Sequence, residues 1–374
     1  ENIIDKYGSE EKWANITHDR LVKWGFNTVS SSGSYIKNTG FNYTINLNLA
    51  GDNWETGEIA DYFSDEWVNF VDERCKQRIT NVSNDTKLIG YFLDNEVKFS
   101  PDWRTLLDIF DCYMKFSSNS SGKIRLVNFL ENRYKDIDSF NKAWRTNLDS
   151  FSEILHKNRL GIWPYTKKAR IDHNDFLYIV SEQFFRICHN TIRKYDKNHL
   201  ILGTRFQSFL TPKKTIEACT DYVDVISVNH YPPNPLVLPF YYILQKVLDL
   251  VKPTNYLKEY YEITGKPILI TEFYFRALDS GLPNTDPYRF FMPVLFTQRQ
   301  RAVCFELQTR PFISREYSLG YHWFGYCDQP KTGRYDGENS NNGLVNVNDE
   351  PYSILVNRMK KVNKITEDKA RTLC

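Results

Sequence analysis

The sequence predicts an α/β chain folded as a (β/α)8 barrel, in which parallel strands alternate with helices. Three observations favour this fold. Amphipathic helical patterns alternate with short β-branched runs, as in a parallel sheet with crossover helices. Polar residues, including two glutamates, close several of the apolar runs. No repeat, low-complexity tract or Pro/Gly linker divides the 374 residues, so we expect a single barrel domain over residues 1–374.

The expected helices are segments in which apolar residues recur on one face. A strong example is the second helix, where Trp67, Val71 and Cys75 lie on one stripe. Helices are predicted at 9–24, 62–79, 175–195, 241–263, 286–308 and 352–368.

The expected strands are short runs rich in Val, Ile, Leu and aromatic residues, each preceded by a predicted helix or turn. They are predicted at 26–30, 43–49, 88–93, 199–205, 223–228, 267–273 and 319–324. A barrel of this type needs one strand more. Because the chain opens on a helix, we expect the first strand upstream of Glu1, either removed or supplied by another chain.

The segment 100–174 is mainly helical and follows the strand that ends near Leu93. It is too long for an ordinary connection between a strand and a helix. We therefore expect a helical insertion over the strand ends, where it would form one wall of a cleft.

The composition limits the kinds of partner that this chain could bind. Lys and Arg number 48 against 46 Asp and Glu, a net charge of +2, so the chain carries no electrostatic footprint for nucleic acid. No apolar run is long enough to span a membrane, which predicts no membrane partner. Aromatic residues make up 15% of the chain. Such an excess suits either a cleft that stacks flat apolar faces or simply an aromatic core.

The seven cysteines contain no Cys-x-x-Cys pair and no His-spaced pattern, which argues against structural zinc. Disulfides and reduced buried thiols both fit their scatter. We expect no metal and no organic cofactor.

Two glutamates are the best candidates for catalysis. Glu96 closes the run 90–93 after Asp94 and Asn95, and Glu272 closes the run 267–271. Active sites of such barrels lie at the carboxyl ends of the strands. Each glutamate follows a segment that should be buried, where an unpaired carboxylate is costly. A salt bridge at a strand end explains one such glutamate as well as catalysis does, but it explains the pair less well.

Glycoside hydrolysis needs two carboxyl groups, one to protonate the leaving oxygen and one to attack the anomeric carbon, about 5 to 5.5 Å apart in retaining enzymes. The strands before Glu96 and Glu272 could supply that spacing across a barrel mouth. The acid/base would require a raised pKa while the first step is pending.

The segments Asp94–Glu96 and Thr271–Phe273 resemble the acid/base and nucleophile motifs of glycoside hydrolase clan A. The resemblance implies Glu96 as acid/base and Glu272 as nucleophile, with Asn95 holding the substrate 2-hydroxyl. It further implies that Tyr231, in Asn229-His230-Tyr231, contacts the nucleophile. Trp323 would form the floor of the subsite that holds the reacting sugar. Asn229 and His230 are expected at the same site, although His230 could equally form a hydrogen bond inside the barrel.

A narrower resemblance covers most of the chain and points to β-agarases. The segment 20–28, Arg-Leu-Val-Lys-Trp-Gly-Phe-Asn-Thr, is similar to the agarase sequence before the second strand, and 134–144 resembles a helical insertion of β-galactosidase-like relatives. The most distinctive match is 323–330, Trp-Phe-Gly-Tyr-Cys-Asp-Gln-Pro, which continues through Gly333 to Tyr352.

The loop after Trp323 is dense in side chains that bind hydroxyl groups. Its substrate-binding candidates are Asp328, Gln329, Arg334 and Glu338. A hydrated surface loop is the alternative, since Gly and Asn are also ordinary turn residues.

The sequence thus predicts a retaining glycoside hydrolase that cleaves a β-linked galactan such as agarose, with a poly- or oligosaccharide as its partner. A clan A hydrolase of another β-glycan (β-galactoside, mannan or glucan) and a carbohydrate-binding barrel without turnover are the alternatives. A polymeric substrate favours a secreted, extracellular protein.

Overall fold

The computed structural model describes the chain in five stretches, residues 2–30, 39–161, 164–231, 256–285 and 294–373. The chain forms two compact units, which we describe separately. Unit 1 comprises residues 1–45, 226–261 and 266–374, and unit 2 comprises residues 46–225 and 262–265.

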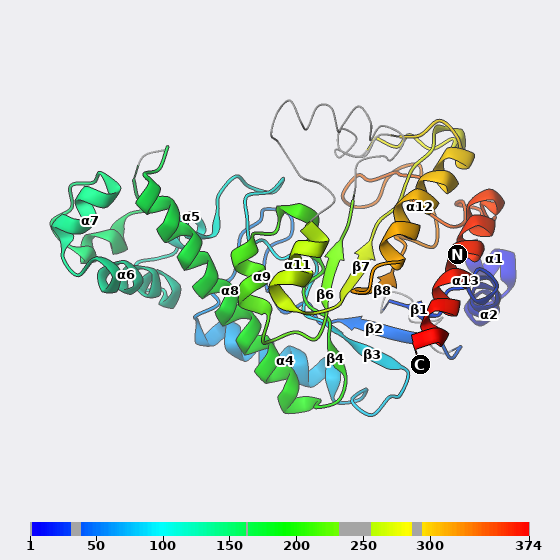
Figure 1. Cartoon of the computed structure of the whole chain (residues 1–374), viewed down its shortest axis with the longest axis horizontal. Helices are drawn as coiled ribbons and strands as arrows, with labels where there is room; N and C mark the ends of the chain where they lie inside the picture. The colour runs from blue at the N-terminus through cyan, green and yellow to red at the C-terminus, as the bar shows by residue number, and fades with distance from the viewer. Residues whose placement is uncertain (1, 31–38, 162–163, 232–255, 286–293, 374) are drawn as a thin grey trace. The chain divides into compact units, whose positions relative to one another are not determined.

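The strands of unit 1 run parallel. They are β1 (Thr28–Val29), β2 (Asn42–Asn46, ending at the boundary), β6 (Ile226–Asn229), β7 (Ile268–Glu272) and β8 (Ser318–Tyr321) (Figure 1). β1 pairs with β2, and β7 lies between β6 and β8. Every residue of β6 is buried, as expected of a parallel strand covered on both faces. The carboxyl ends of β6 and β7 are therefore adjacent.

The described helices of unit 1 are α1 (Asn2–Tyr7), α2 (Glu10–Lys23), α12 (Gln298–Ile313) and α13 (Ser353–Leu373), with η4 (Leu278–Ser280) as a short 3-10 turn. Two of them, α2 and α12, begin at well-formed N-caps. The Ser9 hydroxyl accepts from the backbone of Lys12, and Thr297 forms a reciprocal capping box with Gln300. Helices α12 and α13 pack side by side (Figure 1). α11 (Tyr256–Thr264) begins in unit 1 and ends in unit 2.

Unit 2 is built on the parallel pair β3 (Leu88–Phe92) and β4 (Leu200–Ile201). Gly90 faces Leu200 so closely that a Cβ atom there would lie 2.2 Å from the Leu200 carbonyl oxygen. Only glycine allows this approach. Unit 2 also contains α4 (Asp65–Ile79), α8 (Lys167–Tyr195), β5 (Phe206–Gln207), η3 (Ser208–Leu210) and α9 (Lys213–Cys219).

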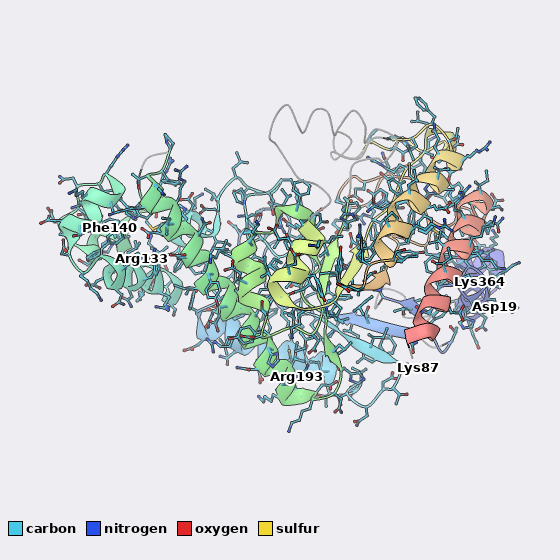
Figure 2. The ribbon with its side chains drawn as sticks, viewed as in Figure 1. Asp19, Lys87, Arg133, Phe140, Arg193 and Lys364 are labelled. Atoms are coloured by element: carbon cyan, nitrogen blue, oxygen red, sulfur yellow. The ribbon has the colours of Figure 1, made fainter. Side chains whose placement is uncertain are left out.

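Four short helical elements in unit 2 pack together beside α8. They are α5 (Ile109–Met114), α6 (Ser121–Tyr134), α7 (Ile137–Trp144) and η2 (Phe151–His156) (Figure 1). The first three contact α8 itself, and the 3-10 helix η2 contacts α6. Asp172 on α8 is buried and accepts hydrogen bonds from Arg133 (2.6 Å), Tyr134 (2.6 Å) and the Trp144 indole (2.7 Å). Figure 2 labels Arg133 and Phe140 in this cluster. One buried carboxylate thus joins three helices.

Each predicted strand has a counterpart, but several are shorter than expected. The strand expected over 199–205 ends at Ile201, because Gly203 and Arg205 adopt positive φ angles of 80° and 52° that no extended strand accommodates. The strand expected over 319–324 ends at Tyr321, so Trp323 lies beyond it. The two-residue strand β5 was not predicted.

The predicted helices are confirmed where the structure describes them. α2, α4, α8 and α13 cover the expected segments, and α8 begins earlier than expected, at Lys167. The expected helices at 241–263 and 286–308 fall partly on residues 241–255 and 286–293, which lie outside the described residues. Segment 100–174 is largely helical; its role as an insertion over the strand ends stays a prediction.

Replacing Asp172 with alanine should lower the free energy of unfolding by about 3 kcal/mol, because it leaves buried donors without an acceptor. Urea denaturation monitored by circular dichroism measures this loss. Asp175→Ala is the matched control, since Asp175 binds the same Arg133 at an exposed position and should cost less than about 1 kcal/mol. Equal losses in the two variants would contradict the bridging role of Asp172.

Candidate active site

Glu272 is the last residue of β7 and is held by residues that follow β6. Its side chain is nearly buried, with 9% of the residue exposed. The Tyr231 hydroxyl donates a hydrogen bond of 2.7 Å to Glu272 Oε2, and the His230 amide donates to the Glu272 carbonyl at 2.8 Å. Tyr274 packs edge-on against Tyr231, with ring centroids 5.5 Å apart. The contact between Tyr231 and the candidate nucleophile matches the expectation drawn from the resemblance.

Asn229 and His230 lie inside unit 1. Asn229 is fully buried and accepts a hydrogen bond of 2.9 Å from the Thr271 hydroxyl. His230 is 4% exposed and its ring nitrogens contact the Tyr256 hydroxyl and the Gln308 side-chain amide. If the Gln308 amide donates to Nε2, the other nitrogen carries the proton and donates to Tyr256. Burial lowers the pKa of His230 to about 4, which keeps the ring neutral.

Glu96 belongs to unit 2, where it follows β3 with a positive φ angle of 51°. Few residues other than glycine adopt this conformation, and it persists only where surrounding contacts fix it. Its amide donates to the Thr204 carbonyl at 3.1 Å, and its carbonyl accepts from Arg104 at 2.9 Å and from Gln207 at 3.1 Å. The backbone of the candidate acid/base is therefore fixed on both sides.

Two further carboxyl groups lie near Asn95, in the same unit. Asp94 accepts from the backbone amides of Ala50 and Asn95, both at 2.7 Å, and burial raises its pKa. Asp52 accepts from the Tyr62 hydroxyl at 2.9 Å, and burial raises its pKa to about 7. Perturbed carboxyl groups often gather at functional sites, which makes both residues further candidates for the site region.

Trp323 is partly exposed, and other residues of unit 1 hold its side chain in place. Its indole donates to the Asn342 carbonyl at 2.7 Å, and Phe273 packs edge-on with centroids 5.3 Å apart. The fully buried Arg301 lies 5.4 Å from the Trp323 ring and donates to the carbonyls of Phe275 and Gly343. Burial lowers the pKa of Arg301 to about 10. An aromatic platform fixed in this way suits a ligand-binding surface.

The loop after Trp323 divides into buried and partly exposed polar residues. Asp328 is buried and accepts from Asn341 (2.9 Å), the Gly343 amide (2.7 Å) and the Tyr352 hydroxyl (2.5 Å). Its oxygens maintain the fold of the loop.

The other candidates of this loop bind one another. Gln329 is buried and donates to Glu338 at 2.6 Å, and Arg334 pairs with Glu338 at 3.0 Å and with Asp336. Arg334 and Glu338 are partly exposed. Contact of all these residues with a substrate stays a prediction.

Comparison with known proteins identifies the family. The model of the Glyco_hydro_42 family, described as beta-galactosidase, matches residues 65–259, more than half of the chain. The chain belongs to this family. It is also similar to Beta-agarase B of Vibrio sp. (strain JT0107), with 29% identity over 97% of this chain and 38% of that protein.

Solved agarase structures resemble this Glyco_hydro_42 member along nearly its whole length. The agarase AgWH50C superposes with a TM-score of 0.80 at 26% identity, over 98% of this chain and 51% of its own. An exo-beta-agarase superposes with a TM-score of 0.79 at 27% identity, over 98% and 49%. The chain thus spans about half or less of these relatives. The resemblance to clan A and to β-agarases is confirmed, and the parallel strands are compatible with a barrel.

Sequence reasoning missed the side chains that hold Glu96 of this family member. Arg104 and Gln207 both contact the Glu96 carbonyl and the buried Asp102. One signal was present: Asp102-Trp103-Arg104 places opposite charges around an aromatic residue shortly after a strand end. Gln207 carried no signal, because nothing in its surrounding sequence relates it to Glu96.

Possible metal ligands and cysteines lie scattered over the described residues of this Glyco_hydro_42 member. His, Cys, Asp and Glu side chains in the described ranges nowhere gather in threes that could hold a metal ion. The six described cysteines are free thiols, and all but Cys327 are buried. No helix in the same ranges combines the length and apolarity needed to cross a bilayer.

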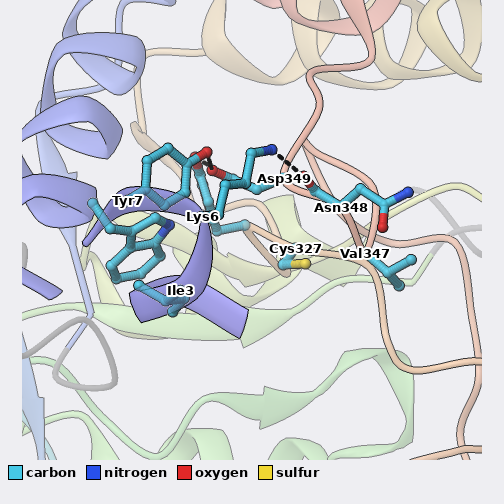
Figure 3. Close-up of a pocket in the computed structure, with 9 residues that line it drawn as sticks. Ile3, Lys6, Tyr7, Cys327, Val347, Asn348 and Asp349 are labelled. Atoms are coloured by element: carbon cyan, nitrogen blue, oxygen red, sulfur yellow. Dashed lines mark hydrogen bonds between the residues drawn. The ribbon is translucent and has the colours of Figure 1, made fainter. Parts of the chain in front are cut away.

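A cavity of about 330 Å³ in unit 1 lies between α1 and the loop 326–349 (Figure 3). Lys6 donates to the Asn348 carbonyl and the Tyr7 hydroxyl to Asp349, which also pairs with Arg20 at 2.9 Å. None of the candidate site residues lines it. We interpret these contacts as the anchor of the N-terminal helix.

Burial of neutral His230 should make stability depend on pH. Its folded pKa of about 4 lies below the ordinary value of 6.5, so its contribution is present above pH 6.5 and is lost as the pH falls through 4. We expect the free energy of unfolding to fall by up to about 3 kcal/mol more in wild type than in His230→Gln between pH 7 and pH 4.

Denaturant titrations at several pH values measure this difference. His18→Gln, a substitution near the surface, should keep the wild-type slope. Identical slopes in wild type and His230→Gln would contradict a neutral buried His230.

Proposed function

We propose that this chain is the catalytic part of a secreted, retaining glycoside hydrolase that cleaves a β-linked galactan such as agarose. The observation that carries the proposal is the nearly buried Glu272 at the end of β7, with the Tyr231 hydroxyl 2.7 Å from its oxygen. A carboxylate oriented by a donor in this way suits a nucleophile. The similarity to beta-agarases supports the substrate class.

In the proposed reaction Glu272 attacks the anomeric carbon while Glu96 protonates the departing glycosidic oxygen, which leaves as an alcohol. The covalent glycosyl–Glu272 ester is then cleaved by water, whose proton returns to Glu96. Asn95 would bind the 2-hydroxyl, and Trp323 would stack against the reacting sugar. The fixed backbone of Glu96 supports this assignment, because an acid/base must keep its position through both steps.

The same proposal extends to the fold. A (β/α)8 barrel over residues 1–374, with the helical segment 100–174 inserted over the strand ends, would place both glutamates at one mouth. Of the polar loop residues, Arg334 and Glu338 are the stronger candidates for substrate contact, because they are partly exposed. Asp328, Gln329, Asn229 and His230 would act mainly by holding the site in shape.

A β-galactoside smaller than agarose is the second candidate substrate, because the matching family is described as beta-galactosidase. Release of reducing sugar from agarose, porphyran, a β-galactoside, mannan and a β-glucan separates the two. If agarose and porphyran stay intact while another glycan is cleaved, the galactan proposal is wrong.

Glu96→Gln and Glu272→Gln should each lower hydrolysis of the cleaved glycan by at least about 100-fold, since each removes one of the two groups that the reaction needs. Reducing-sugar release from purified protein measures the loss. Glu131→Gln on the exposed face of α6 is the control and should keep wild-type activity. Wild-type rates in either test variant would reject the assignment; binding without turnover in wild type would favour a carbohydrate-binding barrel.

Tyr231→Phe should lower kcat/KM about tenfold, because it removes one hydrogen bond to a charged group at the reaction centre. Circular dichroism should show an unchanged fold. Tyr178→Phe, on the surface of α8, should match wild type. Full activity of Tyr231→Phe would show that Glu272 does not depend on this contact.

A further inference from the structure

Two exposed tryptophans of unit 2 lie beside the Glu96 backbone. Trp54 is 38% exposed and Trp103 is 46% exposed, large fractions for side chains of this size. Their rings meet edge to face, with centroids 6.0 Å apart. They come from separate segments, so the pair is a tertiary arrangement and not a local sequence cluster.

One arginine connects this pair to the candidate acid/base. The Arg104 guanidinium carbon lies 4.8 Å from the Trp54 ring centroid and 4.9 Å from that of Trp103. The same guanidinium donates to the Glu96 carbonyl at 2.9 Å and to buried Asp102. Its side chain is only 3% exposed, so it supports the rings from the protein side. The solvent-exposed surface of the pair is therefore aromatic.

The support beneath the rings is hydrogen-bonded and closely packed. Burial opposes ionisation of Asp102, yet its hydrogen bonds with Arg104 hold the pKa of that carboxyl below its ordinary value, so the ion pair persists near neutral pH. Gln207 donates both to Asp102 and to the Glu96 carbonyl. Gly57 packs against Arg104 so closely that a Cβ atom there would lie 2.8 Å from the Arg104 Cβ.

The loop that carries Trp54 is also closed on itself. The Asn53 side chain accepts from the amides of Glu55 and Thr56, and the Asn53 amide donates to the Glu58 carbonyl. Asp52 ties the base of the loop to Ala60 and to the Tyr62 hydroxyl. Exposed aromatic rings on such a frame bind a ligand at little cost in conformational entropy.

We propose that Trp54 and Trp103 form an accessory sugar-binding platform that holds a further residue of the galactan chain next to Glu96. The inference rests on the proposed function, because it is the role of Glu96 that makes a sugar the expected ligand. The flat apolar faces of the tryptophans would stack against the C–H faces of a pyranose ring. Arg104 acts as a positioning residue that connects this platform to the Glu96 backbone.

The test measures binding of agarose-derived oligosaccharides by calorimetry in a Glu272→Gln background, which separates binding from turnover. Trp54→Ala and Trp103→Ala should each raise Kd by about three- to tenfold for a hexasaccharide. Trp103→Phe should restore most of the affinity. Tyr178→Ala, an exposed aromatic residue on α8, should leave Kd unchanged.

The outcomes distinguish the two proposals. Cleavage of agarose by wild type together with unchanged Kd in both tryptophan variants would overturn the platform and leave the proposed function intact. Tryptophan-dependent binding without any cleavage by wild type would support the platform and overturn the hydrolase. Absence of oligosaccharide binding in the Glu272→Gln background would overturn the platform, and wild-type cleavage would then decide the hydrolase alone.

Discussion

The main physical constraint on this molecule is that a carboxylate at the end of a buried strand loses its hydration and needs a hydrogen-bond donor in its place. The Tyr231 hydroxyl supplies that donor to Glu272. β6 and β7 are neighbours in parallel register, so the residue after one strand end lies beside the end of the other. The backbone then adds a second tie, from the His230 amide to the Glu272 carbonyl. The pairing of these two strands thus both builds the sheet and positions the candidate nucleophile.

Glu96 is held in a different way. Its backbone adopts a left-handed conformation. Arg104 and Gln207 donate hydrogen bonds to its carbonyl, and its amide donates to the Thr204 carbonyl. These backbone contacts fix the point from which the side chain of the candidate acid/base extends. The proposed chemistry needs both residues in defined positions, because the nucleophile attacks with its oxygen and the acid/base exchanges a proton at its own.

The sequence predicted those parts of the structure that depend on local pattern. Alternating apolar runs located the strands before Glu96 and Glu272, and the resemblance pointed correctly to the contact of Tyr231. Positive φ angles at Gly203 and Arg205 shortened a strand without leaving a pattern that periodicity could detect. Asp102 and Arg104 are close in sequence, but their contacts with Gln207 and Glu96 escaped prediction because these form only through tertiary folding.

The polar loop after Trp323 shows why residue type alone could not separate binding from support. Asp328 was a reasonable candidate for a substrate ligand, yet its oxygens accept hydrogen bonds from Asn341, Gly343 and Tyr352. A carboxylate with that many donors would lose several hydrogen bonds on turning to a sugar.

Arg301 is a cationic side chain that likewise supports the loop from inside the protein. It is buried beneath Trp323 and donates to the backbone carbonyls of Phe275 and Gly343. Since the loop is fixed by charged groups that solvent does not reach, its partly exposed side chains can be presented to a ligand in a defined geometry. In the proposed function, the buried polar residues of this loop would therefore shape it, and Trp323 with the partly exposed Arg334 and Glu338 would meet the substrate.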